Sequence, residues 1–427
     1  MANSLPFSPA NKYAPYIKAI FILLVIVYLV NILSPLRLHV DTLRYFGIKD
    51  CWELGCDPNS FASQDYLPYG YTALLYGLSK IGLLYSWSII LINCIYLFVS
   101  LYIIKNIFGS KLNGYLFGIA VLLSWTTIKF VVHPLSEMQY VFVSVVSLYF
   151  FYRYTVSKKI LFLLGAFLFG VLAFFTRTVG IALFAALFAG ILWEYRKQII
   201  NLIRKHKVLV LIGAGLLVLT VLFSKQLGLN HYTGVLSKQF EEGASVLTVF
   251  KWHFQEWAEI VFNISMAKVN GFIPATITGW VFTLLGVLCF GTICYFFFSK
   301  NNNIPVIIKI YILFYSILMF NWPFYDPRFW VPVLPLIFAG VLVTPLNFNN
   351  NAVLKFLKNG YVVFFIVLGL AAIGFMSSTS LNKKEMIKKQ ANGVYRNEYE
   401  TSFYGKPLSD TAKQVDTVIV SVLNRHN

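Results

Sequence analysis

The first long apolar run of the chain reads IKAIFILLVIVYLVNILSPL and covers residues 17–36. An α-helix needs about 20 mostly apolar residues to cross the hydrocarbon core of a bilayer, and this run has that length. Of the 427 residues, 58% are hydrophobic and 12% are charged, whereas soluble domains carry about 25% charged residues. The sequence therefore predicts an all-α, polytopic membrane protein.

The same length rule predicts about 11 spanning helices. We place them at about residues 17–36, 85–104, 112–132, 134–152, 160–176, 178–193, 208–224, 274–298, 305–321, 329–344 and 357–376. The first run has no small-residue cleavage site and is longer than the apolar part of a signal peptide. We therefore expect it to remain in the protein as an anchor.

Lysine and arginine residues gather in alternate short loops, and loops of that kind face the cytoplasm. The basic residues concerned are Lys12, Lys105, Lys111, Arg153, Lys158, Lys159, Arg196, Lys197, Arg204, Lys205, Lys207, Lys300, Lys355 and Lys358. Among the 17 acidic residues, Glu194 alone falls in a predicted cytoplasmic loop. The acids therefore gather at the extracytoplasmic side.

Three larger segments lie on that side in this topology. They are a first loop at about residues 34–84, a long loop at about 225–273 and a short tail at 377–427. The apolar stretch 67–84 and the aromatic and polar stretch 250–257 are expected to form juxtamembrane helices at the interface. We assign residues 1–376 to the transmembrane domain.

The net charge of +18 is typical of nucleic-acid-binding proteins and also of membrane proteins with basic loops. No basic soluble domain is present to carry nucleic acid, so we expect membrane lipids as partners and no nucleic acid. Cys51 and Cys56 of the first loop either form a disulfide or stay as free thiols, and the sequence does not decide between the two. We assign no cofactor, although Asp50, Asp57 and Asp65 leave a divalent metal open.

The residues LHVDTLRY at positions 38–45 follow directly on the first run. Ionisable groups beside the hydrocarbon core are costly and are therefore candidates for function. Asp41 is the candidate catalytic residue, and Arg44 and Tyr45 are candidate supporting residues. The ordinary alternative for Asp41 is a solvated loop acid, and Asp65 competes for its role within the same loop.

Further candidates lie at three other predicted helix ends. Lys129, His133 and Glu137 occupy the turn KFVVHPLSE between the third and fourth spans, where Glu137 lies about one turn into an apolar run and needs a partner. A structural ion pair and a functional role both stay open for it. Arg177 and Arg328 each lie beside an apolar run, and two arginines at one membrane face would bind a phosphate group well. For Arg328 the alternative is an anchor paired with Asp326.

Several motifs are absent from the sequence. It has no Walker A loop, no Gly-x-Ser-x-Gly turn, no His-Glu-x-x-His pair and no Asp-x-Asp pair. ATP-driven transport, serine hydrolysis and zinc proteolysis lose support, as does a metal-bound nucleotide-sugar donor.

The motifs that are present, in their order, resemble the GT-C superfamily of integral membrane glycosyltransferases. These motifs are an Asp with a following Arg-Tyr in the first outer loop, Pro-Leu-Ser-Glu at a turn, Thr-Arg at an outer helix end, and Arg-Phe-Trp-x-Pro-x-x-Pro opening a late helix. The bacterial relatives of protein mannosyltransferases and lipid A aminoarabinose transferases are most similar. Many relatives carry Asp-Glu in the first loop, whereas Thr42 follows Asp41 here.

The resemblance implies an inverting transfer of a sugar from a polyprenyl-phosphate donor on the extracytoplasmic face of a bacterial cytoplasmic membrane. It implies Asp41 as the catalytic residue, Arg177 and Arg328 near the donor phosphate, and Glu137 as the acid of the turn. Lys129 and His133 are candidates for assisting the phosphate. The acceptor, a lipid, glycan or protein, stays open.

Three other functions are consistent with the sequence. The first is a lipid-linked polysaccharide polymerase or ligase, which would carry its key residues in large late outer loops. The second is a transporter or flippase of a lipid-linked saccharide, which would favour charges near the membrane midplane and internal repeats. The third is an assembly protein without an active site.

Overall fold

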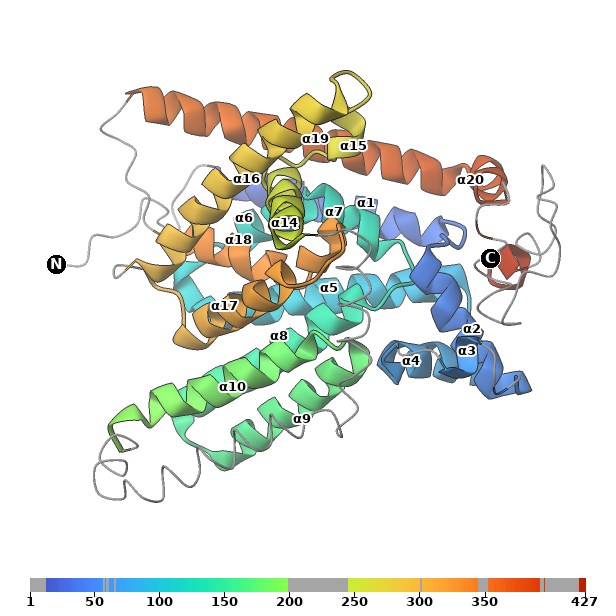
Figure 1. Ribbon diagram of the computed structural model, residues 1–427, viewed down its shortest axis with the longest axis horizontal. Helices are drawn as coiled ribbons and strands as arrows, with labels where there is room; N and C mark the ends of the chain where they lie inside the picture. The colour runs from blue at the N-terminus through green and yellow to red at the C-terminus, as the bar shows by residue number, and fades with distance from the viewer. Residues whose placement is uncertain are drawn as a thin grey trace.

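The computed structural model describes residues 13–56, 58, 61–64, 67–198, 245–299, 302–344, 352–391, 395 and 422–427. Throughout these ranges the regular secondary structure is helical, and they contain no strand (Figure 1). The predicted all-α class is therefore confirmed for the part of the chain that the structure describes.

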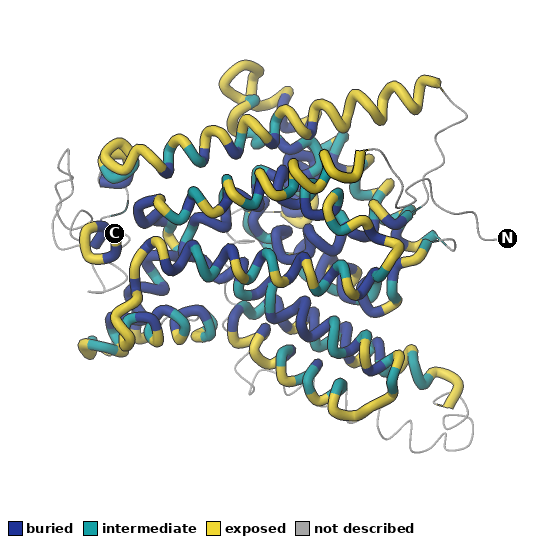
Figure 2. The backbone as a smooth tube through the Cα atoms, turned by 180° about the vertical axis from the view of Figure 1, so that it is seen from behind, coloured by how far each residue is buried: buried dark blue, intermediate teal, exposed yellow. Residues whose placement is uncertain are grey.

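Among the described residues, four helices are long and apolar enough to cross a membrane. They are Ala14–Leu33 (α1 with η1), Ser86–Lys111 (α5 with η2), Ala275–Phe298 (α16) and Ala352–Leu381 (α19). Each contains or overlaps a predicted span. Many apolar side chains of α1 and α19 are exposed, among them Ile20, Leu23, Val363 and Val367, and Figure 2 shows α19 exposed along most of its length. Such a surface is compatible with contact to lipid.

A fifth apolar stretch, predicted as one span at 112–132, is two helices bent by 73°. They are Gly114–Leu122 (α6) and Trp125–Val131 (α7). Asn263 lies at the break, where its side chain accepts a hydrogen bond from the Trp125 backbone at 2.8 Å and donates one to the Leu123 carbonyl at 2.9 Å. The amide thus replaces helical hydrogen bonds that the bend removes.

The other predicted spans correspond to shorter or less apolar helices. These are Glu137–Ser157 (α8), Ile160–Thr176 (α9), Gly180–Glu194 (α10), Val306–Phe320 (α17) and Leu334–Val343 (α18). The predicted span at 208–224 lies outside the described residues. The structure thus supports four spans, or five with the bent pair, and the total of about 11 stays a prediction.

The helices pack as a bundle with a buried centre (Figure 2). In Figure 1, α19 runs along one side, while α8, α9 and α10 form a group at the opposite side. Helix α8 contacts α5 and α9, and α10 contacts α17. The end of α9 contacts Tyr69–Lys80 (α4), a helix of the first loop.

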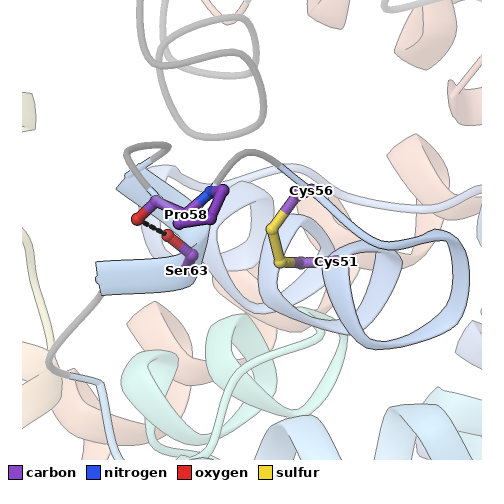
Figure 3. Close-up of a disulfide and its surroundings, with 4 residues drawn as sticks. All are labelled: Cys51, Cys56, Pro58 and Ser63. Carbon is purple, nitrogen blue, oxygen red and sulfur yellow. Dashed lines mark hydrogen bonds between the residues drawn. A yellow bond between two sulfur atoms is a disulfide. The ribbon is translucent and has the colours of Figure 1, made fainter.

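The first loop is largely helical, as predicted for 67–84. It contains Val40–Leu54 (α2), Phe61–Gln64 (α3) and Tyr69–Lys80 (α4). Gly70 lies so close to the end of α9 that an added Cβ would be 2.6 Å from the Phe175 carbonyl oxygen. Cys51 and Cys56 form a disulfide, with 4.9 Å between their Cα atoms (Figure 3). Of the two alternatives that the sequence left open for Cys51 and Cys56, the structure contains the disulfide.

The stretch 250–257, expected to form a helix along the interface, belongs to Val246–Val261 (α14), which buries one face in the bundle while Leu247 and Phe250 are exposed. It lies against α16, where Gly286 allows close contact because an added Cβ would clash with the Phe254 carbonyl. Its polar residues His253 and Glu256 have no exposed surface. Burial is tolerated because the two side chains bond each other and the late loop.

Candidate functional site

Asp41 lies in the first turn of α2, where its backbone N–H donates to the Nδ1 atom of His39 at 3.3 Å. Burial, followed by the charge of Arg328, lowers the pKa of His39, so that ring is neutral and can accept this hydrogen bond. Arg44 lies one turn on, with its Nη1 atom 3.4 Å from an Asp41 carboxylate oxygen. The positive end of the helix dipole also favours an anion here.

Arg328 reaches Asp41 from a different part of the chain. It belongs to Pro327–Trp330 (η4), a short 3-10 helix that the Asp326 side chain caps by accepting from the Arg328 backbone N–H at 3.0 Å. The guanidinium Nη2 lies 2.5 Å from the Asp41 Oδ2 atom, and Nε lies 2.9 Å from the Asp326 carboxylate. Arg328 is 8% exposed. One buried cation therefore serves two carboxylates.

A second ion pair joins the ends of α8 and α9. Glu137 is the first residue of α8 and is 1% exposed, and Arg177 follows the last residue of α9. Arg177 donates to the Glu137 carboxylate and lies 3.4 Å from the Ser136 hydroxyl. Tyr45 of α2 donates to that same hydroxyl at 2.9 Å, which ties this pair to the helix that carries Asp41.

The two pairs form one group, which we call the ion cluster. Its members are Asp41, Arg44, Glu137, Arg177, Asp326 and Arg328. Arg328 Nε lies 3.9 Å from the Glu137 carboxylate and so links the pairs. Three acids and three arginines leave the cluster without net charge, and mutual pairing offsets the cost of burying them.

The two central arginines both lie against Phe329. The guanidinium carbon is 6.0 Å from that ring for Arg177 and 5.2 Å for Arg328. The predicted convergence of these two arginines is therefore present in the fold. The Nη1 atom of Arg328 is buried without a hydrogen-bond partner among the described residues, so it keeps a donor for a ligand anion.

The ion cluster sets the charge state of Asp41. Burial opposes ionisation of this carboxyl, but Arg328 first and then Arg44 outweigh it and lower the pKa from 3.8 to about 2. Burial likewise opposes the charge of Arg328, while the Asp41 and Glu137 carboxylates raise its pKa above the ordinary value. Both groups are therefore charged at neutral pH.

Lys129 and His133 lie outside this network. The Lys129 ammonium sits over two rings of α7, 5.4 Å from that of Trp125 and 5.0 Å from that of Phe130. The His133 ring is hydrogen-bonded through Nδ1 to the Lys129 carbonyl at 2.6 Å, and burial lowers its pKa to about 3. His133 is thus neutral and offers no charge to a phosphate in this arrangement. Within the described ranges Lys129 forms no ion pair with the cluster, although burial and the charges of Asp326 and Arg328 act on its pKa.

The candidate metal ligands of the first loop do not form a site in the described residues. Asp65 and Asp57 lie outside those residues. Asp50 is buried and paired with Lys49 at 2.5 Å, and Lys49 also binds Glu53 at 2.8 Å. The described ranges contain no group of three or more His, Cys, Asp or Glu side chains that could hold a metal ion.

Arg328 is held in place by Glu256 and His253 of α14, two residues that we did not predict from the sequence as part of the site. Glu256 of α14 accepts from the Trp330 indole at 2.8 Å and from the Asp326 backbone at 2.6 Å, and these two residues flank Arg328. His253 bonds the same carboxylate at 2.7 Å and the Trp322 carbonyl at 2.7 Å. The signal available was a His and a Glu three residues apart in an aromatic helix, which indicates one shared face.

Comparison with known proteins does not assign this chain to a family. No protein-family model matches the chain, and no curated protein does. The function therefore rests on the residues themselves.

Proposed function

We propose that this chain is an inverting glycosyltransferase that moves a sugar from a polyprenyl-phosphate donor to an acceptor hydroxyl group. The observation that carries the proposal is the contact between Asp41 and Arg328, 2.5 Å apart at a junction of helix ends. Such transfer needs a carboxylate base and a cation for the leaving phosphate at one place. The extracytoplasmic face of a bacterial cytoplasmic membrane is the proposed location.

The reaction is a single displacement at the anomeric carbon of the sugar. The acceptor oxygen forms the new bond to this carbon while its proton passes to Asp41. The bond between the carbon and the phosphate oxygen breaks, and its electron pair leaves with the phosphate. The leaving group is an anion, so it needs no proton from an acid. Arg328 stabilises it with its Nη1 donor, which has no hydrogen-bond partner among the residues that the structure describes.

Donor binding and base strength are coupled in this proposal. In the free protein Asp41 is a weak base, because its pKa is about 2. A phosphate that shares the Arg328 guanidinium weakens the attraction between Arg328 and Asp41. The pKa of Asp41 then rises toward the ordinary range of a carboxyl group, and proton transfer becomes more favourable.

Arg177 and Glu137 take supporting roles. Arg177 is the proposed second phosphate ligand, because its guanidinium lies beside the Phe329 ring that Arg328 also contacts. Glu137 holds Arg177 in the free protein, and Tyr45 steadies the arrangement through Ser136. Lys129 and His133 need a change of contacts before they could assist.

A transporter of a lipid-linked saccharide is the second candidate. The 73° break between α6 and α7 favours it, since broken spans line substrate paths in transporters. The ion cluster argues against it, because its members lie at the ends of α2, α8 and α9 and in η4. Charges for transport would lie near the middle of spans.

The test compares glycolipids and glycoproteins by mass spectrometry in cells that lack the chain and in cells complemented with wild type, Asp41→Asn or Glu194→Gln. Glu194 is an acid at the far end of α10, paired with Lys158, and serves as the control. We expect one glycosylated product in cells with wild type or Glu194→Gln. Cells that lack the chain, and cells with Asp41→Asn, should contain only the unmodified acceptor. Normal product with Asp41→Asn would overturn the proposal. If no new glycosylated product forms and the intact lipid-linked saccharide instead moves from one leaflet to the other, the transporter is favoured.

A further inference from the structure

The backbone that leads into α2 is held by one side chain from late in the sequence. Gln390, the last residue of Lys383–Gln390 (α20), donates from Nε2 to the Leu36 carbonyl at 2.7 Å. Its Oε1 atom accepts from the Leu38 backbone N–H. Gln390 is 4% exposed. A single amide group therefore bonds the backbone on both sides of Arg37.

Arg37 adds a second link to the same late region. It is 3% exposed and donates from Nη2 to the Met376 carbonyl at 3.1 Å and to the Ser380 hydroxyl at 2.8 Å. Its Nε atom donates to the Ser34 hydroxyl at 3.0 Å. These bonds attach the segment to the end of α19, directly before α20. Burial lowers the pKa of Arg37 to about 10.

A third link comes from the last residues of the sequence. The Asn427 side-chain oxygen accepts from the Leu36 backbone N–H at 2.5 Å. The backbone carbonyl of His426 accepts a hydrogen bond from the Ser86 N–H at 2.6 Å. The imidazole ring of His426 lies 4.9 Å from the ring of Phe46 in α2. The start of α2 is thus enclosed by residues that are distant in sequence.

These bonds matter because Leu36, Arg37 and Leu38 lie between η1 and α2, outside any helix or strand. Buried backbone groups without such bonds need partners elsewhere, and Gln390 supplies two of them. Leu38 directly precedes His39, the N-cap of α2, and Asp41 follows in the first turn. Any shift of Leu38 therefore moves Asp41 relative to Arg328, which is fixed separately by Glu256 through η4.

We propose that Gln390 is a positioning residue, which fixes Asp41 through the backbone of Leu36 and Leu38 at the distance from Arg328 that sugar transfer requires. This inference rests on the proposed function. Gln390 contacts neither reacting group and acts only through the segment that it holds. A misplacement of about 1 Å in a reacting group can cost on the order of 100-fold in rate.

The test uses the full-length protein in nanodiscs, with wild type, Gln390→Ala and the control Lys389→Ala, which removes an exposed neighbour on α20. The donor probe is the polyprenyl-phosphate-linked sugar fraction extracted from cells that lack the chain. We expect Gln390→Ala to lower kcat about 10- to 100-fold with the donor KM changed less than about twofold. Amide hydrogen exchange over residues 36–45 should become faster in this variant alone.

A conservative variant refines the comparison and covers a folding failure of Gln390→Ala. Gln390→Glu keeps an acceptor for the Leu38 N–H but loses the donor to the Leu36 carbonyl, so its kcat should lie between the other two. Unchanged exchange over residues 36–45 would overturn the inference, as would faster exchange with a wild-type kcat. Wild-type protein that transfers no sugar would refute the proposed function instead, while the exchange rates would still decide whether Gln390 fixes this segment.

Discussion

Arg328 and Asp41 share one short contact, 2.5 Å between Nη2 and Oδ2, and this contact sets the ionisation of the carboxyl group. The Nη1 atom of the same guanidinium has no hydrogen-bond partner within the described part of the chain. A phosphate bound there and the Asp41 carboxylate would therefore draw on one cation. Donor binding and the strength of the base become linked properties of a single side chain.

The first prediction concerns pH. The folded pKa of Asp41, about 2, lies below its ordinary value of 3.8, so the carboxylate stays ionised until the pH falls to that value. The acid limb of kcat/KM reports the free protein and should lie near pH 2, while that of kcat reports the donor complex and should lie higher. Initial rates over roughly pH 3 to 8 check this, because kcat/KM should stay level down to the acid end of that range while kcat already falls. Superimposed acid limbs would contradict the coupling.

The second prediction concerns removal of the base. Asp41→Asn should lower kcat by about 10²- to 10⁴-fold, since the amide cannot take the acceptor proton. Binding of sugar-free polyprenyl phosphate should persist or tighten, because Arg328 loses a competing carboxylate. Tryptophan fluorescence can follow this binding, as Trp330 lies two residues from Arg328. A rate near wild type, with unchanged thermal stability, would remove Asp41 as the base.

The third prediction concerns the phosphate ligand. Arg328→Lys keeps the positive charge but loses the forked donor geometry, so the donor KM should rise about 10-fold or more. The pKa of Asp41 should rise as well, which moves the acid limb of kcat/KM upward. Arg153→Lys on α8, whose arginine donates to the Tyr149 hydroxyl, is the matched control and should leave both quantities unchanged. An unaltered donor KM in Arg328→Lys would exclude this residue from the phosphate site.

The fourth prediction concerns the pair of Glu137 and Arg177, whose side chains are 1% and 15% exposed. Glu137→Gln alone leaves a buried guanidinium without its charge partner and should lower the free energy of unfolding by about 3–5 kcal/mol. The double variant Glu137→Gln with Arg177→Gln should lose less than the sum of the single losses. Unfolding in mixed micelles measures all four proteins. Additive losses would mean that the pair is not coupled.

The fifth prediction distinguishes two roles of α14: the role of Glu256 in holding Arg328, and the role of Gln255 in packing against α16. Glu256→Gln weakens the bonds to the Trp330 indole and the Asp326 N–H, so η4 should loosen and the donor KM should rise. Gln255→Ala is the control, because the Gln255 side chain bonds the Gly279 carbonyl and Thr283 on α16 instead. It should lower thermal stability without a change in donor KM. Equal donor KM values in the two variants would contradict the role of Glu256.

The sequence predicted much of the fold because an apolar run of spanning length leaves a helix as the simplest solution. It predicted the neighbourhood of Asp41, Glu137, Arg177 and Arg328 because each lies at a helix end on the same expected side. It could not predict the partners. Arg328 lies two residues after Asp326 in sequence, yet its shortest ion pair is with Asp41, and only three-dimensional packing brings Arg328 and Asp41 together.

Two local features also escaped prediction for a physical reason. The alternation of aromatic and polar groups in α14 indicates a helix but not what covers it, and here α16 and η4 do. The break between α6 and α7 depends on Asn263, which is remote in sequence and replaces the missing backbone bonds. Neither dependence is visible within a window of neighbouring residues.

The enclosure of the segment before Asp41 by Gln390 and Asn427 has a consequence for biosynthesis. A ribosome delivers Asp41 to the membrane long before it has made α19 and α20. During that interval Leu36 and Leu38 lack their bonds to Asn427 and Gln390, and for much of it Arg328 has not yet been made. Under the proposed function, nascent chains are therefore expected to remain inactive until α19 and α20 dock.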